Sequence, residues 1–419
     1  MPLERMLKNK LKRFWPIALF ALIHIIVFMV LFEGAFAKDW EGDYSILVFF
    51  DYASRVFNGE LPYQDFSIEY PPIALLVMTV PRLITADPLH YQIAFASQIL
   101  IFDLIGLLIL TDMAKRLGYS LWITLAISTI ALVVSGPLIT ERFDLIPAIL
   151  VLCALYSFSR GWNTASWITL GIATMIKTYP IVIVPLFALY LLKQKNYSSL
   201  VKGTLTFGFT LLVIIVPCLC LSPEGFYESY SYHAERGLQI ESTYASVLLL
   251  GNTLGLTGGE IRFDHAAWHM DTSLADSLAD ASLPIMAIIL TMVYAIYAMQ
   301  KQVETERSAH SRLISYFLLA ILAFMVTSKV LSPQYIIWIY PLIPLIAGQW
   351  RIVYWMLFIL IGAITYYIYP DHYDELLVRE PRLIYILTMR NILLIVLAFV
   401  LIEWKHLFKN KKDQVNEIA

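Results

Sequence analysis

The sequence predicts an all-α, polytopic membrane protein, and two observations lead to this class. Hydrophobic residues make up 59% of the 419 residues and charged residues only 15%, whereas soluble domains carry about 25% charged residues. The apolar residues also form runs of about 17 to 23 residues, close to the length of helix that crosses the hydrocarbon core of a bilayer. Because these runs are continuous and do not alternate with a period of two, they indicate helices and not a β-barrel.

The amino-terminal part of the chain predicts a cytoplasmic tail, one span and an acidic outer loop. Residues 1–14 contain a cluster of Lys and Arg, which favours the cytoplasmic side, and residues 15–37 form the first apolar run. In the loop 38–89, apolar residues recur at helical spacing over 46–58, which predicts an amphipathic helix at the membrane surface. The run at 72–83 is too short to span and predicts a second interfacial or re-entrant helix.

Further apolar runs bring the total to about twelve helical segments, counting the short ones. The predicted spans are 90–112, 119–138, 143–159, the broken pair 164–176 and 180–192, then 200–221, 283–300, 312–328, 334–348, 351–369 and 384–403. The broken pair is interrupted by Lys177 and Pro180, and basic residues flank both of its ends, which places both ends on the cytoplasmic side. Such a break at membrane depth requires surrounding protein or a wet cavity.

The distribution of charge predicts the side that each loop faces. Basic residues gather in the tails and in alternate loops, whereas acidic residues dominate the other loops. We therefore expect a single membrane-embedded domain, 1–419, in the plasma (cytoplasmic) membrane, with cytoplasmic tails at 1–14 and 404–419. The first loop, 38–89, and a long loop, 222–282, are expected on the extracytoplasmic side.

Cysteine, histidine and aromatic residues that can mark functional sites are given structural interpretations. The three cysteines lie within apolar runs, which predicts neither a disulfide nor a metal site. His265 and His269 have the i, i+4 spacing of zinc ligands on a helix but lack the Glu of the His-Glu-x-x-His motif, so no metal site is expected. Aromatic residues near span ends are interpreted as an interfacial belt, and the alternative for a minority of them is stacking against a ligand or lining its groove. They include Tyr335, Trp338, Tyr340, Tyr366, Tyr367 and Tyr369.

Ionisable residues at membrane depth gather at the predicted outer end. They are Asp43, Glu69, Arg142, Asp144, Lys177, His233, Arg236 and Lys329. Each such group near the bilayer centre costs about 3 kcal/mol on insertion, so groups of both signs at one end predict a cavity for a polar, anionic ligand. The alternative for any one of them is an interfacial side chain that reaches water.

Five motifs, in order along the chain, resemble those of a known family. They are Gly42-Asp43 with Gly59-Glu-Leu-Pro-Tyr63 and Glu69-Tyr-Pro-Pro72, then Arg142-Phe-Asp144, Lys177-Thr-Tyr-Pro180, His233-Ala-Glu-Arg236 and Ser328-Lys329-Val-Leu-Ser332-Pro333-Gln-Tyr335. Over about residues 40 to 345 the chain thus resembles the polyprenol-phosphate-mannose-dependent glycosyltransferases of family 87. These belong to the GT-C class of membrane transferases.

The resemblance implies a GT-C-like helical fold and a reaction. A sugar, usually mannose, passes from a polyprenyl-phosphate-linked donor to a hydroxyl of a lipid-linked or glycan acceptor on the extracytoplasmic face. A hydroxyl is a weak nucleophile, so a carboxylate must take its proton as it attacks C1 of the sugar. Direct displacement would invert the anomeric configuration.

Asp43 is the predicted general base of this reaction. The stretch from Asp43 to Tyr52 is about two residues longer than the family pattern, so Asp51 is the alternative base. The competing role of Asp43 is structural, because an Asp in front of the 46–58 helix can serve as its N-cap.

The leaving group is a lipid phosphate whose charge grows in the transition state, and fixed cations can stabilise it. Lys177, Arg236 and Lys329 are the predicted phosphate ligands, and His233 is predicted to hydrogen bond the phosphate or the donor.

Three further residues are assigned to substrate. Glu69 is predicted to bind the acceptor or orient a cation, with a role in the turn before Pro71 as the alternative. Arg142 and Asp144 are predicted to contact substrate, with a mutual ion pair as the alternative.

Missing motifs limit the other possibilities. The chain has no Asp-x-Asp pair, no Gly-x-Gly-x-x-Gly and no Walker motif, which disfavours nucleotide-sugar donors and ATP-driven work. The expected partners are the lipid-linked donor, the acceptor and membrane lipid, with no cofactor and no nucleic acid. The rival hypothesis is a transporter or flippase, because broken helices and buried charges also occur there. No internal repeat supports the transporter hypothesis. A third possibility is a ligase that joins lipid-linked glycans.

Overall fold

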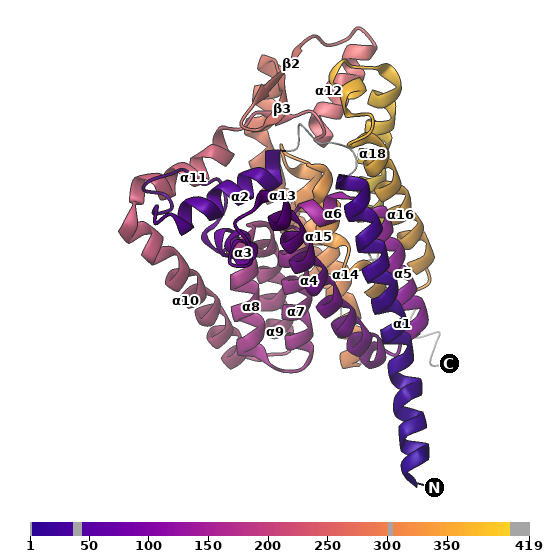
Figure 1. Cartoon of the computed structure of the whole chain (residues 1–419). Coiled ribbons are helices and arrows are strands. Elements are labelled where there is room, and N and C mark those ends of the chain that lie inside the picture. Colours follow the sequence, from indigo (N-terminus) through magenta and orange to yellow (C-terminus); the bar gives the residue numbers. More distant parts are fainter. Residues whose placement is uncertain (1, 37–43, 301–304, 403–419) are drawn as a thin grey trace, which may run out of the picture.

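The computed structural model describes residues 2–36, 44–300 and 305–402 and confirms the all-α membrane class. Long helices form a bundle, and a small sheet with short helices covers one end of it (Figure 1).

The elements follow one another with few long connections. The first half comprises α1 (Pro2–Phe36), α2 (Tyr44–Phe57), α3 (Pro72–Arg82), α4 (Pro88–Leu117), α5 (Leu121–Val134), α6 (Leu138–Glu141), α7 (Leu145–Ser159), α8 (Asn163–Ile176), η1 (Tyr179–Ile183), α9 (Val184–Lys193) and α10 (Tyr197–Leu221). The second half comprises α11 (Pro223–Glu235), β1 (Leu238–Gln239), α12 (Thr243–Thr253), β2 (Glu260–Asp264), β3 (Ala267–Asp271), α13 (Ser273–Met299), α14 (Glu306–Thr327), η2 (Pro333–Tyr335), α15 (Ile336–Ile339), η3 (Ile343–Leu345), α16 (Arg351–Ile368), α17 (Tyr373–Leu377) and α18 (Pro381–Val400).

Seven helices in the described part of the chain are long and apolar enough to cross a membrane. They are α1 over Phe14–Gly34, α4, α10, α13, α14, α16 and α18. Shorter apolar helices, among them α5 and α7, pack between them. This number of spans makes the chain an integral membrane protein.

Local signals explain where the predicted helices begin and end. The run predicted at 90–112 becomes the longer α4 because capping residues extend it at both ends. Asp87 accepts a hydrogen bond from the backbone N–H of His90, and Pro88 occupies the first turn, where its missing N–H is not needed. At the other end Gly118 adopts a left-handed φ of 63°, which is the usual way for a helix to stop.

The two short helices of the first loop are confirmed as α2 and α3. On α2, Ile46, Phe49 and Ala53 are buried, which is the apolar face predicted from their helical spacing. The helix ends just before Gly59, whose φ is 89°. The apolar face of α2 packs against α3 and α4, and this packing fixes the first loop against the bundle.

The broken span is confirmed, whereas the span predicted at 334–348 is wrong. The helix α8 ends at Ile176, Lys177 is extended, and the chain continues as η1 and α9. Residues 333–345 instead form η2, α15 and η3, three short buried turns. The prolines at 333, 341 and 344 lack the backbone N–H that a continuous helix needs, so the apolar run cannot be one helix.

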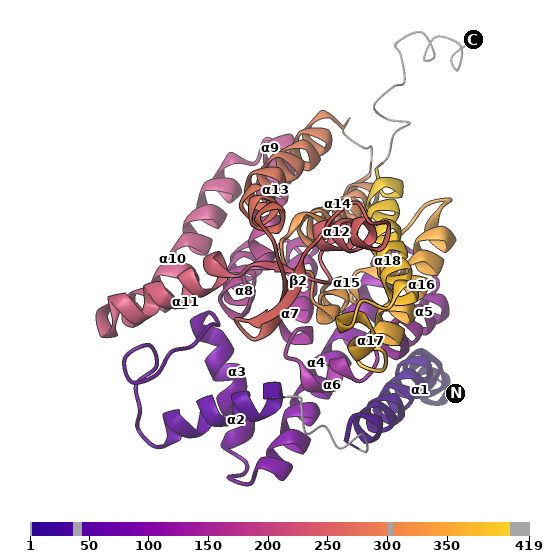
Figure 2. The same cartoon turned by 90° about the horizontal axis from the view of Figure 1, so that it is seen from above.

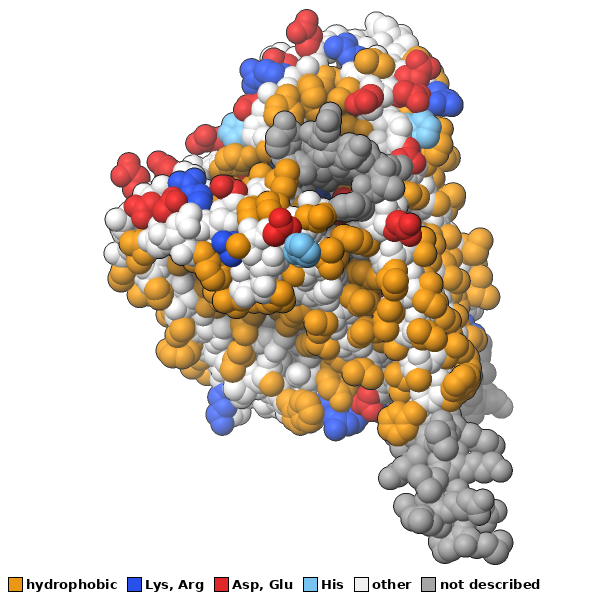
Figure 3. Space-filling view, viewed as in Figure 1, with side chains coloured by type: hydrophobic (Ala, Val, Ile, Leu, Met, Phe, Trp, Pro, Cys, Tyr) orange, Lys and Arg blue, Asp and Glu red, His pale blue; other side chains and the backbone are white. Residues whose placement is uncertain are grey.

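Burial shows which helices lie at the centre. In α14, 78% of its most apolar window is buried, against 6% in α10, and both views place α10 at the periphery (Figures 1 and 2). Hydrophobic side chains cover the middle of the surface in Figure 3. Acidic side chains gather, together with several Lys and Arg side chains, on the end that carries α11 and the sheet.

The long loop contains a sheet that the sequence did not predict. Its order is β1-β3-β2, and both pairs are antiparallel. His265 lies in the β2–β3 turn and His269 on β3, so the helical spacing considered for these histidines does not apply. The sheet rests over the end of the bundle from which α11 and α13 emerge (Figure 1).

A buried polar network joins α1 to the rest of the bundle. The imidazole Nδ1 of His24 lies 2.5 Å from Asp103 Oδ2, and these side chains are 0% and 1% exposed. The hydroxyl of Tyr340 donates to the other carboxylate oxygen at 2.7 Å, and Nε2 of His24 lies 3.0 Å from the Thr129 hydroxyl. Four separate segments therefore depend on one carboxylate.

We predict that Asp103→Asn lowers the free energy of unfolding by about 3 to 5 kcal/mol, because it leaves His24 buried without its anionic partner. The measurement is the melting temperature of the protein in detergent. Asp112→Asn is the control, since its pair with Arg116 is about 40% exposed and contributes at most about 1 kcal/mol. Equal melting temperatures for Asp103→Asn and the wild type would contradict the role of the network.

Candidate functional site

The centre of the predicted site is the buried carboxylate of Asp144. Asp144 lies between α6 and α7, and its side chain is only 2% exposed. Its Oδ1 accepts a hydrogen bond from Lys177 Nζ at 2.5 Å and from the indole N–H of Trp338 at 2.6 Å. Three interruptions of helical structure therefore meet at one oxygen: the α6–α7 junction, the break after α8, and the short helix α15.

Aromatic rings surround this pair. Trp338 is stacked between Tyr179 and Tyr335, with centroid distances of 4.2 and 3.7 Å. The ammonium of Lys177 lies 5.1 Å from the ring centroid of Phe143 and 5.6 Å from that of Trp338. Such ring faces attract a cation and exclude water. Lys177 is thus held at a fixed place, with 17% of its side chain still exposed.

Glu69 and His233 meet above this centre. Glu69 Oε2 accepts a hydrogen bond from the Tyr52 hydroxyl at 2.5 Å. The imidazole Nε2 of His233 donates to the backbone carbonyl of Glu69 at 2.6 Å, so its Nδ1 is left to act as an acceptor. Protein atoms displace water from this ring and lower the pKa of His233, and the positive charge of Arg236 also lowers it. The first loop and α11 are joined at this contact.

Lys329 and Arg236 belong to the same region. Lys329 Nζ donates to the carbonyl of Ala234 at 2.6 Å, and Arg236 follows α11 directly. Gln239 holds the Lys329 segment in place, because its backbone N–H donates to the Lys329 carbonyl at 3.0 Å. Its side-chain carbonyl also accepts from the backbone N–H of Leu331 at 2.8 Å. The sheet therefore positions the loop that carries Lys329.

Tyr70 shows that the remaining predicted residues lie nearby. Its hydroxyl is within electrostatic reach of Glu69, Arg142, Asp144 and Arg236, and its ring lies 5.2 Å from that of Phe143. The structure thus brings together Glu69, Arg142, Asp144, Lys177, His233, Arg236 and Lys329.

The two candidate bases are Asp43 and Asp51. Asp43 lies outside the described residues. Asp51 is exposed on α2, away from the buried face formed by Ile46, Phe49 and Ala53.

Two residues of the site were missed from the sequence. Trp338 was interpreted as part of an interfacial belt, and this is wrong for both Trp338 and Tyr340, each only 2% exposed. The signal that could have identified Trp338 is its place in a run broken by prolines. Gln239 carries no sequence signal, because its role depends on pairing with a segment about 90 residues away.

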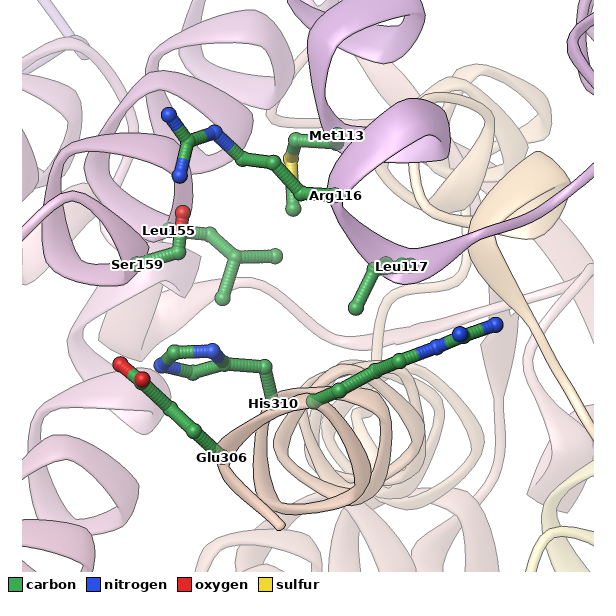
Figure 4. A pocket seen from close by; sticks show the side chains of 8 residues that line it. Met113, Arg116, Leu117, Leu155, Ser159, Glu306 and His310 are labelled. Atoms are coloured by element: carbon green, nitrogen blue, oxygen red, sulfur yellow. The ribbon is translucent and has the colours of Figure 1, made fainter.

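A separate cavity lies at the other end of the bundle and contains none of the predicted site residues (Figure 4). Its volume is about 210 Å³, and Glu306 and His310 of α14 face Leu155 and Ser159 of α7 across it. Because α14 also runs from this cavity toward Lys329, about 30 Å separate the two ends.

Acid sensitivity of the fold is expected at His269, next to the site. His269 is 4% exposed, and burial, followed by the charge of Arg236, lowers its pKa to about 4. Unfolded histidine takes up a proton near pH 6.5. The unfolded chain therefore binds more protons between these values, and stability present above about pH 6.5 is lost as the pH falls toward 4.

We predict that His269→Asn shows a smaller fall in melting temperature between pH 7.5 and pH 5 than the wild type. His90→Asn, at an exposed histidine, should leave the pH dependence unchanged. An identical pH dependence in His269→Asn and the wild type would show that His269 does not carry this effect.

Comparison with known proteins identifies the family of this chain. Residues 68–328, more than half of the chain, match glycosyltransferase family 87. GPI mannosyltransferase 1 of Kluyveromyces lactis is 25% identical over 315 residues, which cover 72% of this chain and 71% of that protein. The matched range includes Glu69, Arg142, Asp144, Lys177, His233 and Arg236, whereas Asp51, Lys329 and Trp338 lie outside it. The chain therefore belongs to glycosyltransferase family 87 and is a membrane glycosyltransferase.

Proposed function

We propose that this protein transfers mannose from a polyprenyl-phosphate-linked donor to a hydroxyl of a lipid-linked or glycan acceptor. The observation that carries the proposal is the convergence of Lys177, Arg236 and Lys329 around His233 at one end of the bundle. A phosphate leaving group gains negative charge as the sugar departs, and cations held in place by protein stabilise it without reorganisation. The similarity to a mannosyltransferase supports mannose as the sugar.

In this proposal Asp43 is the general base and the reaction inverts the anomeric centre. Support comes from α2, which begins at Tyr44 and packs its Phe49 ring 5.3 Å from that of Phe143, the neighbour of Asp144. Asp43 directly precedes α2 in the sequence, and α2 contacts the site through Phe49. Asp51 remains the alternative base. The site faces the extracytoplasmic side, with both termini in the cytoplasm, as the charge distribution predicts.

The roles within the site follow from the contacts. Asp144 orients Lys177 toward the phosphate, and Trp338 orients Asp144. Arg236 and Lys329 approach the phosphate from the α11 side, and Nδ1 of His233 accepts a hydrogen bond from a hydroxyl of the donor sugar. Arg142 completes the cationic set, and Glu69 binds the acceptor.

The test is sugar transfer in proteoliposomes from radiolabelled polyprenyl-phosphate-mannose to a panel of alkyl glycosides that includes octyl α-D-mannopyranoside. We expect Asp43→Asn to lower kcat by about 100-fold or more, because a general base typically contributes 10² to 10⁴. Asp51→Asn is the matched control and should retain activity.

The reverse result, loss in Asp51→Asn and full activity in Asp43→Asn, would move the base to Asp51. Movement of labelled lipid across the bilayer without any transfer would instead favour the transporter hypothesis. A product that keeps the donor's anomeric configuration would contradict direct displacement.

We also predict that Trp338→Phe lowers kcat by about 10-fold while the protein stays folded. Phenylalanine keeps the stack with Tyr179 and Tyr335 but removes the N–H that holds Asp144, and one hydrogen bond to a charged group is worth about 1.5 kcal/mol or more. Trp355→Phe is the control, because it loses a similar bond, to the carbonyl of Ile343 at 3.1 Å, away from the site. Equal activity of both variants would remove Trp338 from the site.

A further inference from the structure

The turn between β2 and β3 has an unfavourable backbone. Asp264 pairs with Ala267, so only His265 and Ala266 form the turn. Their φ angles are 46° and 53°, both left-handed, which is the geometry of a type I′ turn. This turn favours Asn-Gly, and each side chain in the left-handed region costs about 1 to 2 kcal/mol. Backbone strain of this kind tends to be retained at functional sites.

The strained turn fixes the imidazole of His265. Its Nδ1 lies 2.9 Å from Asp264 Oδ2, and its backbone N–H donates to the other carboxylate oxygen at 2.8 Å. The hydrogen bond from His265 lowers the pKa of Asp264, which therefore accepts as an anion. Because Nδ1 lies beside this anion, the proton of a neutral ring is favoured on Nδ1, and Nε2 is left as a hydrogen-bond acceptor.

The ring of His265 is linked to the candidate site through one aromatic residue. Its centroid lies 5.0 Å from that of Tyr232 on α11, and the Tyr232 ring lies 5.6 Å from that of His233, which contacts Glu69. His269 Nε2 donates to the Asp264 carbonyl at 3.0 Å, and this hydrogen bond stabilises the turn. Seen from above, β2 lies over the middle of the bundle (Figure 2).

The chemistry at this turn suits a neutral, hydroxyl-rich ligand. Arg262 lies 3.7 Å from the Asp264 carboxylate, so this pair has no net charge to attract a phosphate. The cations that attract one lie at Lys177, Arg236 and Lys329. An imidazole acceptor beside the face of Tyr232 offers a sugar both a hydrogen bond and an aromatic surface.

We propose that His265, oriented by Asp264, binds a hydroxyl of the acceptor sugar at the outer edge of the site. The proposal rests on the transferase function proposed above, because that function defines the acceptor. The strain of the His265–Ala266 turn then has a reason, because the Asn-Gly pair that this turn favours has no side chain long enough to reach the ligand as an imidazole does.

The test compares His265→Asn with Ala266→Gly in proteoliposomes. Asparagine tolerates the left-handed conformation but is too short to replace the imidazole, whereas glycine at 266 relieves strain and leaves His265 in place. With octyl α-D-mannopyranoside as acceptor, we expect His265→Asn to raise the acceptor KM about 10-fold, the loss of about one hydrogen bond. The donor KM and the melting temperature should change little. Ala266→Gly should leave both KM values unchanged and raise the melting temperature.

A second measurement does not require turnover. Diethyl pyrocarbonate modifies accessible imidazoles, and mass spectrometry follows the modification of His265. We expect octyl α-D-mannopyranoside to protect His265, and the polyprenyl-phosphate-mannose donor not to.

The outcomes separate this proposal from the function on which it rests. Transfer by the wild type with an unchanged acceptor KM in His265→Asn would overturn the role of His265 and leave the transferase standing. A raised acceptor KM in both variants would assign the effect to the turn and also overturn it. Protection by the mannoside without any transfer would support the sugar site while the proposed reaction fails. If neither transfer nor protection is observed, both proposals are overturned.

Discussion

Burial of the Asp144 carboxylate is the constraint on which the site depends. An ion removed from water costs several kcal/mol unless a partner of opposite charge and further hydrogen bonds replace its hydration. Lys177 and Trp338 supply these partners from segments far apart in the sequence. Lys177 lies at a helix break and Trp338 on a helix of four residues, so neither side chain is directed by a long regular span. Charged groups therefore meet inside the bundle at these breaks as well as between regular helices, as His24 and Asp103 do.

A second set of contacts ties the outer elements to this centre. Gln239 joins β1 to the Lys329 segment through backbone and side-chain hydrogen bonds, and His233 joins α11 to the first loop. The sheet, α11 and the first loop thus depend on each other for position. Lys177 is paired with a carboxylate, whereas Lys329 and His233 donate to backbone carbonyls, which supply partial negative charge without adding a carboxylate.

The sequence predicted the class, most spans and the break at Lys177, because apolar runs and helix-breaking residues act locally. It also identified the ionisable residues that the structure gathers, since such residues are costly at membrane depth. It failed over 334–348, where apolar composition suggested a span but prolines prevent one. It failed for the sheet, because the strands of two to five residues alternate too briefly to give a pattern. Trp338 and Gln239 act through partners about 190 and 90 residues away, and no local signal encodes such a contact.

The helix α10 is exposed along most of its length, so we expect it to contact membrane lipid. Only Gly203 and Phe207, in the first half of this helix, are buried, and the helix slants away from α8 toward α11 (Figure 1). Its 25 residues rise about 37 Å, more than the hydrocarbon core of about 30 Å. A helix of this length is accommodated in the bilayer by tilting, and the tilt depends on the thickness of the membrane. Because α11 begins directly after α10 and carries His233, we expect the thickness of the bilayer to affect the position of His233 at the site.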